Sequence, residues 1–356
     1  MKEKNSTPFF SICIPTYNRS KYLDKALQSV IKQDFFDYEI VILDNNSTDD
    51  TYLVVERYQK ITSRIIYIKN SKNVGLSRNL VDCFYNARGK YLFMLSDDDL
   101  ILKSGTLSYL HSLIIKFKMP GYIKLAALFY LDKFNSLSDL YKLFVYPQRL
   151  EYISPLDHNF FLKIIDKQIE FMSGSVYKLE KKELNRLNEK DYVYITLDYI
   201  CYSTYHFGGL IVGDSYILGR YFETNHLLSP TFFYPNFSMD TLIKTAYKYI
   251  PSATDFNDYS DMIRRQWLLQ TANIKLFCED KLMKKYIPKI AKNDERRLSN
   301  LVFYILAYIS LLFPRSIIKI FKGIYQSKLK DETSTYIKKM RLEPILSEII
   351  NLPSPV

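Results

Sequence analysis

Three consecutive aspartates, Asp97, Asp98 and Asp99, follow a short apolar run that ends at Leu95. Adjacent carboxylates repel one another, and this arrangement is costly unless a cation or several hydrogen-bond donors offset the repulsion. Oxygen ligands suit a hard divalent ion such as Mg²⁺ or Mn²⁺, which keeps waters and completes its shell with substrate phosphates. The run therefore predicts a site for a metal and a nucleotide diphosphate. An acidic turn that caps the following helix is the alternative.

Polar residues also follow two other predicted strands. Asp44 comes directly after the run 40–43, where a carboxylate can accept a hydrogen bond from a nucleobase imide or a ribose hydroxyl. An earlier loop combines a threonine, an aromatic ring, an amide and a guanidinium, which can hold a base and a phosphate or simply form a loop. Its residues are Pro15, Thr16, Tyr17, Asn18 and Arg19.

A turn glycine, Gly75, precedes another predicted helix. The first amides of that helix, together with Arg78, could meet a phosphate or the sugar. The segment is neither a Gly-x-Gly-x-x-Gly loop nor a Walker loop. Nicotinamide dehydrogenases and phosphate-loop ATPases are therefore disfavoured.

Short β-rich runs alternate with amphipathic segments over the first hundred residues, which is typical of a doubly wound, mostly parallel α/β sheet. Ligands of such sheets bind outside the carboxyl ends of the strands, so the three polar loops should converge on one crevice. The expected strands cover 9–14, 38–43, 65–68 and 91–95, and a helix covers 21–33.

The pattern loosens beyond residue 100 and reads as helix from about 238 onward, with breaks near four prolines. We expect one domain over 1–235, divided into a nucleotide-binding half (8–102) and an acceptor half (103–235), and a helical region over 236–356. The later elements should be helices over 104–117 and 196–206, and strands over 123–130, 171–178 and 210–218.

The 356-residue chain is 47% hydrophobic, which supports a sizeable core, and its net charge is +11. Residues 251–356 hold 18 Lys and Arg against 11 Asp and Glu, so this region could meet anionic lipid or form a solvated helix face. The apolar run Leu301–Phe313 is too short to span a bilayer and favours a core helix, with a helix on the membrane surface as the alternative.

Four widely spaced cysteines indicate reduced thiols in a cytoplasmic protein. No nucleic-acid-binding motif is present.

The order of these motifs resembles the N-terminal half of family 2 glycosyltransferases with the GT-A fold. The matching segments are a Pro-Thr-Tyr-Asn-Arg loop at 15–19, an aspartate-led loop at 44–51, an Asn-x-Gly-x-x-Arg-Asn segment at 73–79 and the acidic run at 96–99. The Ser-Asp-Asp-Asp form of that run is similar to the one in abequosyltransferase-like enzymes of bacterial surface polysaccharides. The similarity is close over 8–102 and fades towards 230.

The resemblance implies roles for individual residues. Because Ser96 replaces the usual first aspartate, Asp98 is implied as the principal metal ligand, with Asp99 beside it and Asp97 nearer the donor. The 15–19 loop, Asp44 and Asn46 would surround the nucleotide, and Gly75 and Arg78 would help to position it. Asp198 is the implied catalytic base, although Leu197 replaces the acid that usually precedes it, and Asp191 is the other candidate. Arg220 and His226 are similar to a late arginine and histidine that approach the diphosphate or the metal.

We therefore predict a metal-dependent, inverting glycosyltransferase that uses Mg²⁺ or Mn²⁺ and a nucleotide-sugar donor. Its acceptor would be a glycan hydroxyl, and such acceptors are often lipid-linked, so the basic C-terminal helices could dock on the inner face of the cell membrane. Two alternatives remain. One is a sugar-nucleotide nucleotidyltransferase, which should carry a Gly-rich loop after its first strand. The other is a catalytically silent binding subunit of a polysaccharide assembly complex.

Overall fold

The computed structural model describes residues 7–131, 134–144, 149–157, 160–165, 171–190, 195–221, 245, 248–249, 327 and 331–350. The chain divides into two compact units, one made of Met1–Tyr221 with Thr333–Val356 and the other of Phe222–Glu332. The predicted boundary near residue 235 lies outside the described residues, and so does most of the expected helical region.

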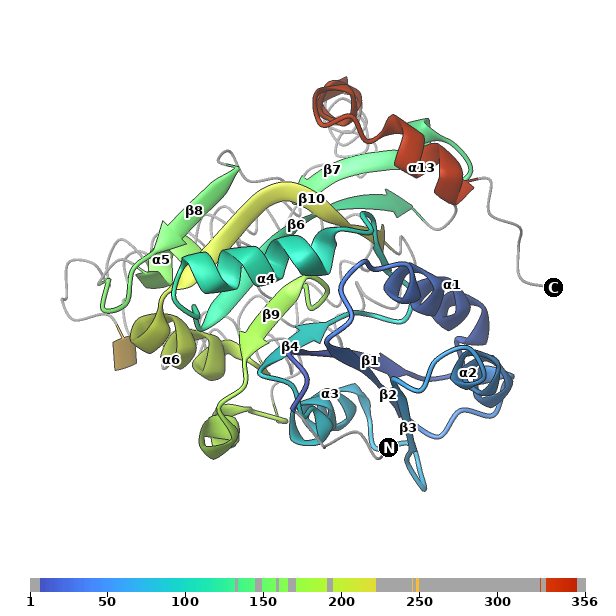
Figure 1. The fold of residues 1–356 in the computed structure, drawn as a ribbon, viewed down its shortest axis with the longest axis horizontal. Helices are drawn as coiled ribbons and strands as arrows, with labels where there is room; N and C mark the ends of the chain where they lie inside the picture. Colours follow the sequence, from blue (N-terminus) through green and yellow to red (C-terminus); the bar gives the residue numbers. More distant parts are fainter. Residues whose placement is uncertain are drawn as a thin grey trace, which may run out of the picture. The chain divides into compact units, whose positions relative to one another are not determined.

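The first four strands form a parallel half-sheet (Figure 1). β1 (Phe10–Thr16) lies between β2 (Tyr38–Asp44) and β4 (Tyr91–Met94), and β3 (Ile65–Lys69) pairs with β2. Since all four run in the same direction, their carboxyl ends lie along one edge. This edge carries the polar loops that the sequence places after β1, β2 and β4.

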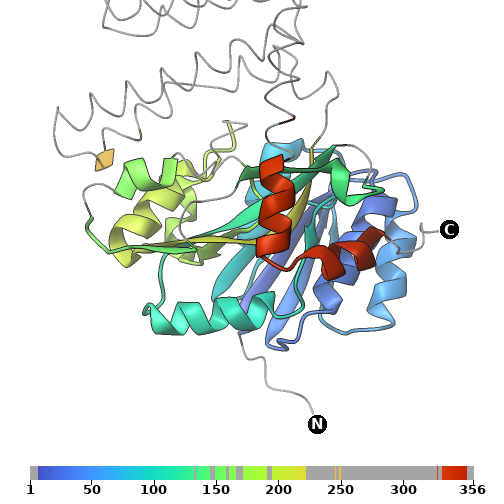
Figure 2. The same cartoon turned by 90° about the horizontal axis from the view of Figure 1, so that it is seen from above.

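Helices cover both faces of this half-sheet because its strands alternate apolar side chains between the faces. Phe10 and Ile12 of β1 pack in the core formed with α1 (Ser20–Ile31), α2 (Thr51–Gln59) and α4 (Thr106–Lys116). Cys13 points to the other face, where its thiol lies 3.7 Å from the carbonyl of Cys83 in α3 (Leu76–Asn86). In Figure 2, α4 and α6 (Leu197–Phe207) lie on opposite sides of the sheet.

The second half of the sheet is mixed. β6 (Tyr122–Leu131) and β10 (Gly209–Tyr221) are parallel to each other, while β9 (Ser175–Lys178) runs antiparallel between β4 and β6. The full order is β3-β2-β1-β4-β9-β6-β10-β5. The predicted α/β fold is thus confirmed, with antiparallel strands that the sequence reading left out. The remaining elements are β5 (Leu100–Ile101), η1 (Leu137–Asp139), β7 (Leu140–Phe144), β8 (Leu150–Ile153), α5 (Phe160–Ile165) and η2 (Lys181–Arg186).

The expected strand over 171–178 is shorter in the structure, because regular pairing starts only at Ser175. Gly174 has a φ of 74°, in the left-handed region, which interrupts an extended backbone. The residues before it therefore form a loop at the carboxyl end of β4.

The C-terminal segment packs against the edge of the sheet. A helix over 331–339 leads into α13 (Glu343–Ile350), which lies beside β7 and α1 in Figure 1. Leu342 and Leu346 join a cluster with Leu128 and Leu218, and Lys32 of α1 pairs with Glu348 at 2.9 Å. Among the described helices, none combines the length and apolar character needed to cross a bilayer.

Candidate functional site

The three aspartates form a tight turn at the carboxyl end of β4. The amide of Asp99 donates to the carbonyl of Ser96 at 3.2 Å. Asp97, Asp98 and Asp99 expose only 3%, 6% and 2% of their surfaces. Because like charges repel strongly away from water, this acid turn (residues 96–99) needs donors or cations on several sides.

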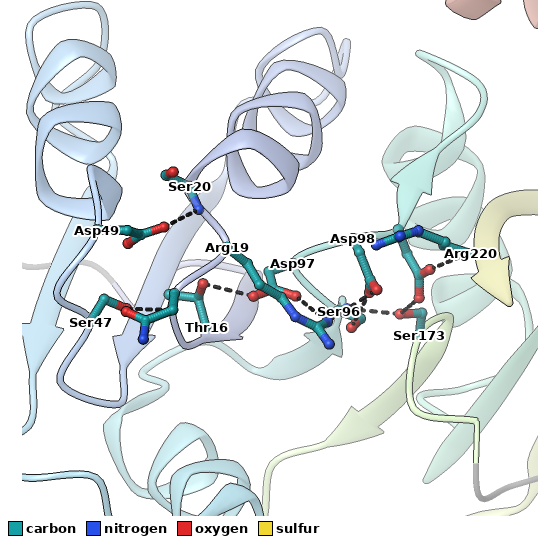
Figure 3. A network of polar contacts seen from close by, with 12 residues as sticks. Thr16, Arg19, Ser20, Ser47, Asp49, Ser96, Asp97, Asp98, Ser173 and Arg220 are labelled. Carbon is teal, nitrogen blue, oxygen red and sulfur yellow. Dashed lines mark hydrogen bonds and ion pairs between the residues drawn. The ribbon is translucent and has the colours of Figure 1, made fainter. Parts of the chain in front are cut away.

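Arg19 supplies a cation on the side that faces the β1 loop (Figure 3). Its Nη1 lies 3.2 Å from Asp97 Oδ1 and 3.1 Å from Asp98 Oδ2. The other oxygen of Asp97 accepts a hydrogen bond from Thr16 Oγ1 at 2.7 Å. Two predicted loops that are 78 residues apart in sequence, those of β1 and β4, therefore meet.

Asp99 turns away from Arg19 and binds the other wall of the site. Its Oδ2 accepts a hydrogen bond from Ser173 Oγ at 2.5 Å, and its Oδ1 accepts one from the backbone amide of Arg220 at 2.9 Å. The guanidinium of Arg220 lies 4.2 Å from the ring centre of Tyr22 in α1. The predicted Arg220 is thus at the acid turn, through its backbone (Figure 3).

Burial and mutual repulsion change the acidity of the turn. Burial raises the pKa of Asp97 to about 7, and the charge of Asp98 adds to this rise, while Arg19 and Thr16 oppose it. Burial, followed by the charge of Asp98, also raises the pKa of Asp99 well above its usual range. At Asp97 and Asp99, the cations and donors of the protein therefore do not fully offset burial and the charge of Asp98.

The chemistry of the acid turn fits Mg²⁺ or Mn²⁺. Asp97 Oδ1 and Asp98 Oδ2 point to a common place, which the guanidinium of Arg19 now fills, whereas Asp99 is held elsewhere. Over the part of the chain that the structure describes, no three His, Cys, Asp or Glu side chains converge on one point. One or two carboxylates suffice for Mg²⁺ when waters and substrate phosphates complete its shell.

Asp44 lies fully buried at the end of β2. Its Oδ1 accepts a hydrogen bond from the amide of Ser47 at 2.7 Å, and its Oδ2 accepts one from the hydroxyl of Tyr67 in β3 at 2.5 Å. Burial and then the hydrogen bond to Asp44 raise the pKa of Tyr67, so its hydroxyl keeps its proton. Each carboxylate oxygen has a second lone pair with which it can accept a hydrogen bond from a ligand.

The loops after β1 and β2 bind each other. The backbone N–H of Asn18 donates a hydrogen bond to Ser47 Oγ at 2.9 Å, and the side-chain Oδ1 of Asn18 accepts one from the backbone N–H of Thr48 at 2.7 Å. Asn18 and Asn46 both have left-handed backbones, with φ values of 53° and 69°, which asparagine tolerates better than most residues. Tyr17 is 43% exposed, so its ring is accessible at this edge, while Pro15 is buried within β1.

The predicted turn at Gly75 joins this edge through asparagines. Asn45 donates to Asn73 Oδ1 at 2.8 Å, and Asn73 Oδ1 also accepts the amide of Gly75 at 2.9 Å. Gly75 has a φ of 84°, and a Cβ at this position would meet no atom within 4 Å. Arg78, in the first turn of α3, pairs with Asp82 at 2.8 Å and with Glu189 at 3.1 Å.

The two candidate bases have different outcomes. Asp198 lies in the first turn of α6, where its side chain is 19% exposed and lies 3.7 Å from Arg186. Asp191 and His226 lie outside the described residues. The role of Asp198 therefore stays a prediction.

Sequence reasoning did not assign a role to Ser173 or Tyr67, which contact the predicted acids. Both partners come from strands or loops distant in sequence, 74 residues from Asp99 and 23 residues from Asp44. The Ser-Gly-Ser segment at 173–175 was a usable signal for Ser173, because a glycine between two serines is typical of a close backbone approach. No local pattern marks Tyr67, because it reads as an ordinary strand tyrosine.

Comparison with known proteins agrees with this geometry. Residues 11–117 match the family described as "Glycosyl transferase family 2". The chain is 42% identical over 104 residues to the GalNAc(5)-diNAcBac-PP-undecaprenol beta-1,3-glucosyltransferase of Campylobacter jejuni. These aligned residues cover 29% of this chain and 33% of that protein. It is 41% identical over 96 residues to an abequosyltransferase of Salmonella typhimurium, with coverage of 26% and 29%. The match thus spans about a third of the length of these relatives.

A solved structure extends the likeness of the fold beyond the matched residues. Residues 1–349 of Staphylococcus aureus TarS, in complex with UDP, superpose with a TM-score of 0.56 at 16% identity, covering 88% of this chain and 91% of that one. The acid turn lies within the residues that match the family. Residues 11–117 match a family 2 glycosyltransferase domain, and the fold of the described residues is therefore of the GT-A type.

Proposed function

We propose that the protein transfers a sugar from a nucleotide-sugar donor to a hydroxyl of a glycan acceptor in the synthesis of a bacterial surface polysaccharide. The observation that carries this proposal is the convergence of Asp97 and Asp98 on Arg19, at the edge where β1, β2 and β4 end. Buried carboxylates beside a loop cation are suited to a metal and a diphosphate. The relatives, by name, transfer glucose or abequose.

The donor would lie along the carboxyl edge of the parallel strands. Asp44 would accept a hydrogen bond from the base or ribose, and the exposed ring of Tyr17 would pack against the nucleotide. Arg19 would meet the diphosphate when a metal takes its place beside Asp98. Asn46 and Gly75 lie in the adjoining loops and would offer backbone groups to the donor.

Mg²⁺ or Mn²⁺ would be held by Asp98, with Asp97 or Asp99 nearby. When bound, the ion would neutralise negative charge that develops on the departing diphosphate. Arg19 and the amides of the surrounding loops would orient the donor, which lowers the entropic part of the barrier.

Transfer would proceed by attack of an acceptor hydroxyl on the anomeric carbon of the donor sugar. A new C–O bond forms as the bond to the diphosphate oxygen breaks, and the hydroxyl proton passes to a carboxylate acting as base. Asp198 is our candidate for this base, and Asp191 is the other. Attack opposite the leaving group would invert the anomeric centre.

The acceptor would be lipid-linked, as the undecaprenol in the name of the Campylobacter relative suggests. The excess of basic residues in 251–356 is suited to the anionic cytoplasmic surface of a membrane. We therefore place the protein in the cytoplasm, in peripheral contact with the cell membrane.

A donor panel tests the proposed function. The purified protein is incubated with nucleotide sugars that differ in base and sugar, with Mn²⁺ or Mg²⁺ or with EDTA, and released nucleoside diphosphate is measured. Metal-dependent release, increased by polyprenyl-diphosphate glycans, is the expected result. Absence of release from every donor, with or without acceptors, would overturn the proposal.

A further inference from the structure

A lysine side chain on a central strand of the sheet is buried. Lys124 of β6 is 1% exposed. Its ammonium donates to the carbonyl of Phe171, to the carbonyl of Ser173 at 3.4 Å and to Ser175 Oγ at 3.1 Å. Burying an ammonium costs free energy, and a well-packed apolar residue often gives equal or greater stability at such a position. Stability alone is therefore a weak reason for a lysine here.

These three acceptors of Lys124 share one segment, residues 171–175, which runs between β4 and β6. The amide of Gly174 donates to the carbonyl of Met94 at 3.1 Å, and its carbonyl accepts the amide of Leu125 at 2.8 Å. Gly174 is left-handed, and a Cβ there would lie 2.9 Å from Ile217 Cγ1. The glycine thus sets the backbone direction, while the lysine binds carbonyls that this turn directs inward.

Ser173, within this segment, binds both ends of the acid turn. Its hydroxyl donates to Asp99 Oδ2 at 2.5 Å and accepts the amide of Ser96 at 2.8 Å (Figure 3). Its own carbonyl is one of the two that Lys124 binds in this segment. A single residue therefore connects the buried ammonium to the first and last residues of the turn.

We propose that Lys124 is a positioning residue, which holds the 171–175 segment so that Ser173 fixes the acid turn in its binding geometry. The kinetic part of this inference rests on the proposed transferase function. Residues that orient metal-binding carboxylates without touching the metal typically affect affinity or activity about 10–100-fold. The Phe171 ring, centred 5.1 Å from the ammonium and packed edge-on against Phe129, further holds the segment.

Three variants separate this role from general packing. Lys124→Met keeps an unbranched side chain that is one atom shorter and removes the ammonium, and Ser173→Ala removes the hydroxyl that contacts the acid turn. Tyr122→Phe is the matched control, because Tyr122 lies on the same strand and its hydroxyl contacts Ser175 Oγ, at 3.1 Å. Circular dichroism and thermal melting establish that each variant is folded.

Hydrogen exchange tests the contact between the Ser96 amide and Ser173 without any assumption about activity. In the metal-free protein, the amide of Ser96 should exchange faster in Lys124→Met and in Ser173→Ala than in wild type, because its acceptor is displaced or lost. Tyr122→Phe should leave this exchange unchanged. Unchanged exchange at Ser96 in a folded Lys124→Met overturns the inference, whatever the protein catalyses.

Kinetic measurements test whether the displaced acid turn lowers activity. Lys124→Met and Ser173→Ala should each lower kcat/KM and apparent Mn²⁺ affinity by about 10–100-fold. Lys124→Met should have little additional effect in the Ser173→Ala background, since both act through one contact. Fully multiplicative effects would show that Lys124 does not act through Ser173 and would overturn the inference.

Two results distinguish failure of this inference from failure of the proposed function. Faster Ser96 exchange in Lys124→Met than in wild type, together with a wild type that releases no nucleotide from any donor, supports the positioning role and overturns the transferase proposal. An active wild type with unchanged kinetics in folded Lys124→Met overturns the positioning role alone. If Lys124→Met does not fold, Ser173→Ala carries the test, and unchanged exchange and activity in that variant overturn the inference.

Discussion

Arg19 Nη1 lies 3.1 Å from Asp98 Oδ2, at the place to which Asp97 also directs an oxygen. A guanidinium and a divalent metal cannot occupy that place together. The side chain of Arg19 is 40% exposed, so under the proposed function it would move toward a diphosphate while the carboxylates bind the ion. Such an exchange of cations would let the buried acids be tolerated before the donor binds, and it leads to the first two predictions.

Asp98→Asn should abolish most metal-dependent transfer. The substitution keeps the size of the side chain and removes its charge, and stabilisation by a metal is worth several kcal/mol, so kcat/KM should fall by about 100-fold or more. Nucleoside diphosphate release with and without Mn²⁺ measures this loss. Asp24→Asn is the matched control, because Asp24 pairs with Arg57 and not with the acid turn. Wild-type metal dependence in Asp98→Asn would place the metal elsewhere.

Arg19→Gln should destabilise the metal-free protein, and Mn²⁺ should reverse the effect. Removing the guanidinium leaves Asp97 and Asp98 in mutual repulsion, and because Arg19 is part-exposed we expect a fall in Tm of only about 2–4 °C. Thermal melts in EDTA and in Mn²⁺ measure both effects. Arg57→Gln, which removes an exposed ion pair, should show no dependence on metal. A loss of stability that Mn²⁺ does not reduce would contradict the exchange of cations.

Stability of the metal-free protein should depend on the proton of Asp97. Its folded pKa is about 7, above the unfolded value of about 3.9, so between these values the folded state keeps a proton that the unfolded state has lost. This contribution to stability is fully present below pH 4 and is lost as pH rises to about 7. Relative to Asp97→Asn, wild type should therefore lose stability over this range. Urea midpoints in EDTA at several pH values measure the difference, and parallel curves for the two proteins would refute it.

The sequence predicted which polar residues lie at the carboxyl edge of the sheet, but it did not predict their hydrogen-bond partners. The ends of β1, β2 and β4 were readable because each apolar run stops at polar residues, and parallel strands bring such ends together. The direction in which each carboxylate points was not readable. Asp99 faces Ser173, just before β9, and Arg220 in β10, and these contacts depend on tertiary packing rather than on local pattern.

The same limit applies to the second half of the sheet. A continuous strand over 171–178 was a reasonable expectation from apolar residues, yet Gly174 interrupts it and creates the loop that holds the acid turn. Short antiparallel strands such as β5 and β8 carry too few residues for a period of two to be recognised. The buried position of Lys124 contradicts the usual preference of lysine for the surface, so only the structure could reveal it.

Tyr67→Phe should weaken donor binding and leave the chemical step nearly intact. The Tyr67 hydroxyl donates to Asp44 at 2.5 Å and orients the carboxylate that we assign to the base or ribose. Hydrogen bonds to charged groups contribute about 1.5–3 kcal/mol, so the KM for the donor should rise by about tenfold or more. Because the lost interaction is equally present in the ground and transition states, kcat should change little.

Tyr52→Phe is the control for this prediction. Its ring lies 6.0 Å from that of Tyr67, and the residue is 53% exposed, so the substitution tests loss of a neighbouring hydroxyl at the same edge. Initial rates over a range of donor concentrations, at saturating Mn²⁺, separate KM from kcat for both variants. If Tyr67→Phe lowers kcat while KM stays constant, Asp44 acts nearer the reacting diphosphate than the nucleoside, and the donor must lie in the opposite direction along the strand ends.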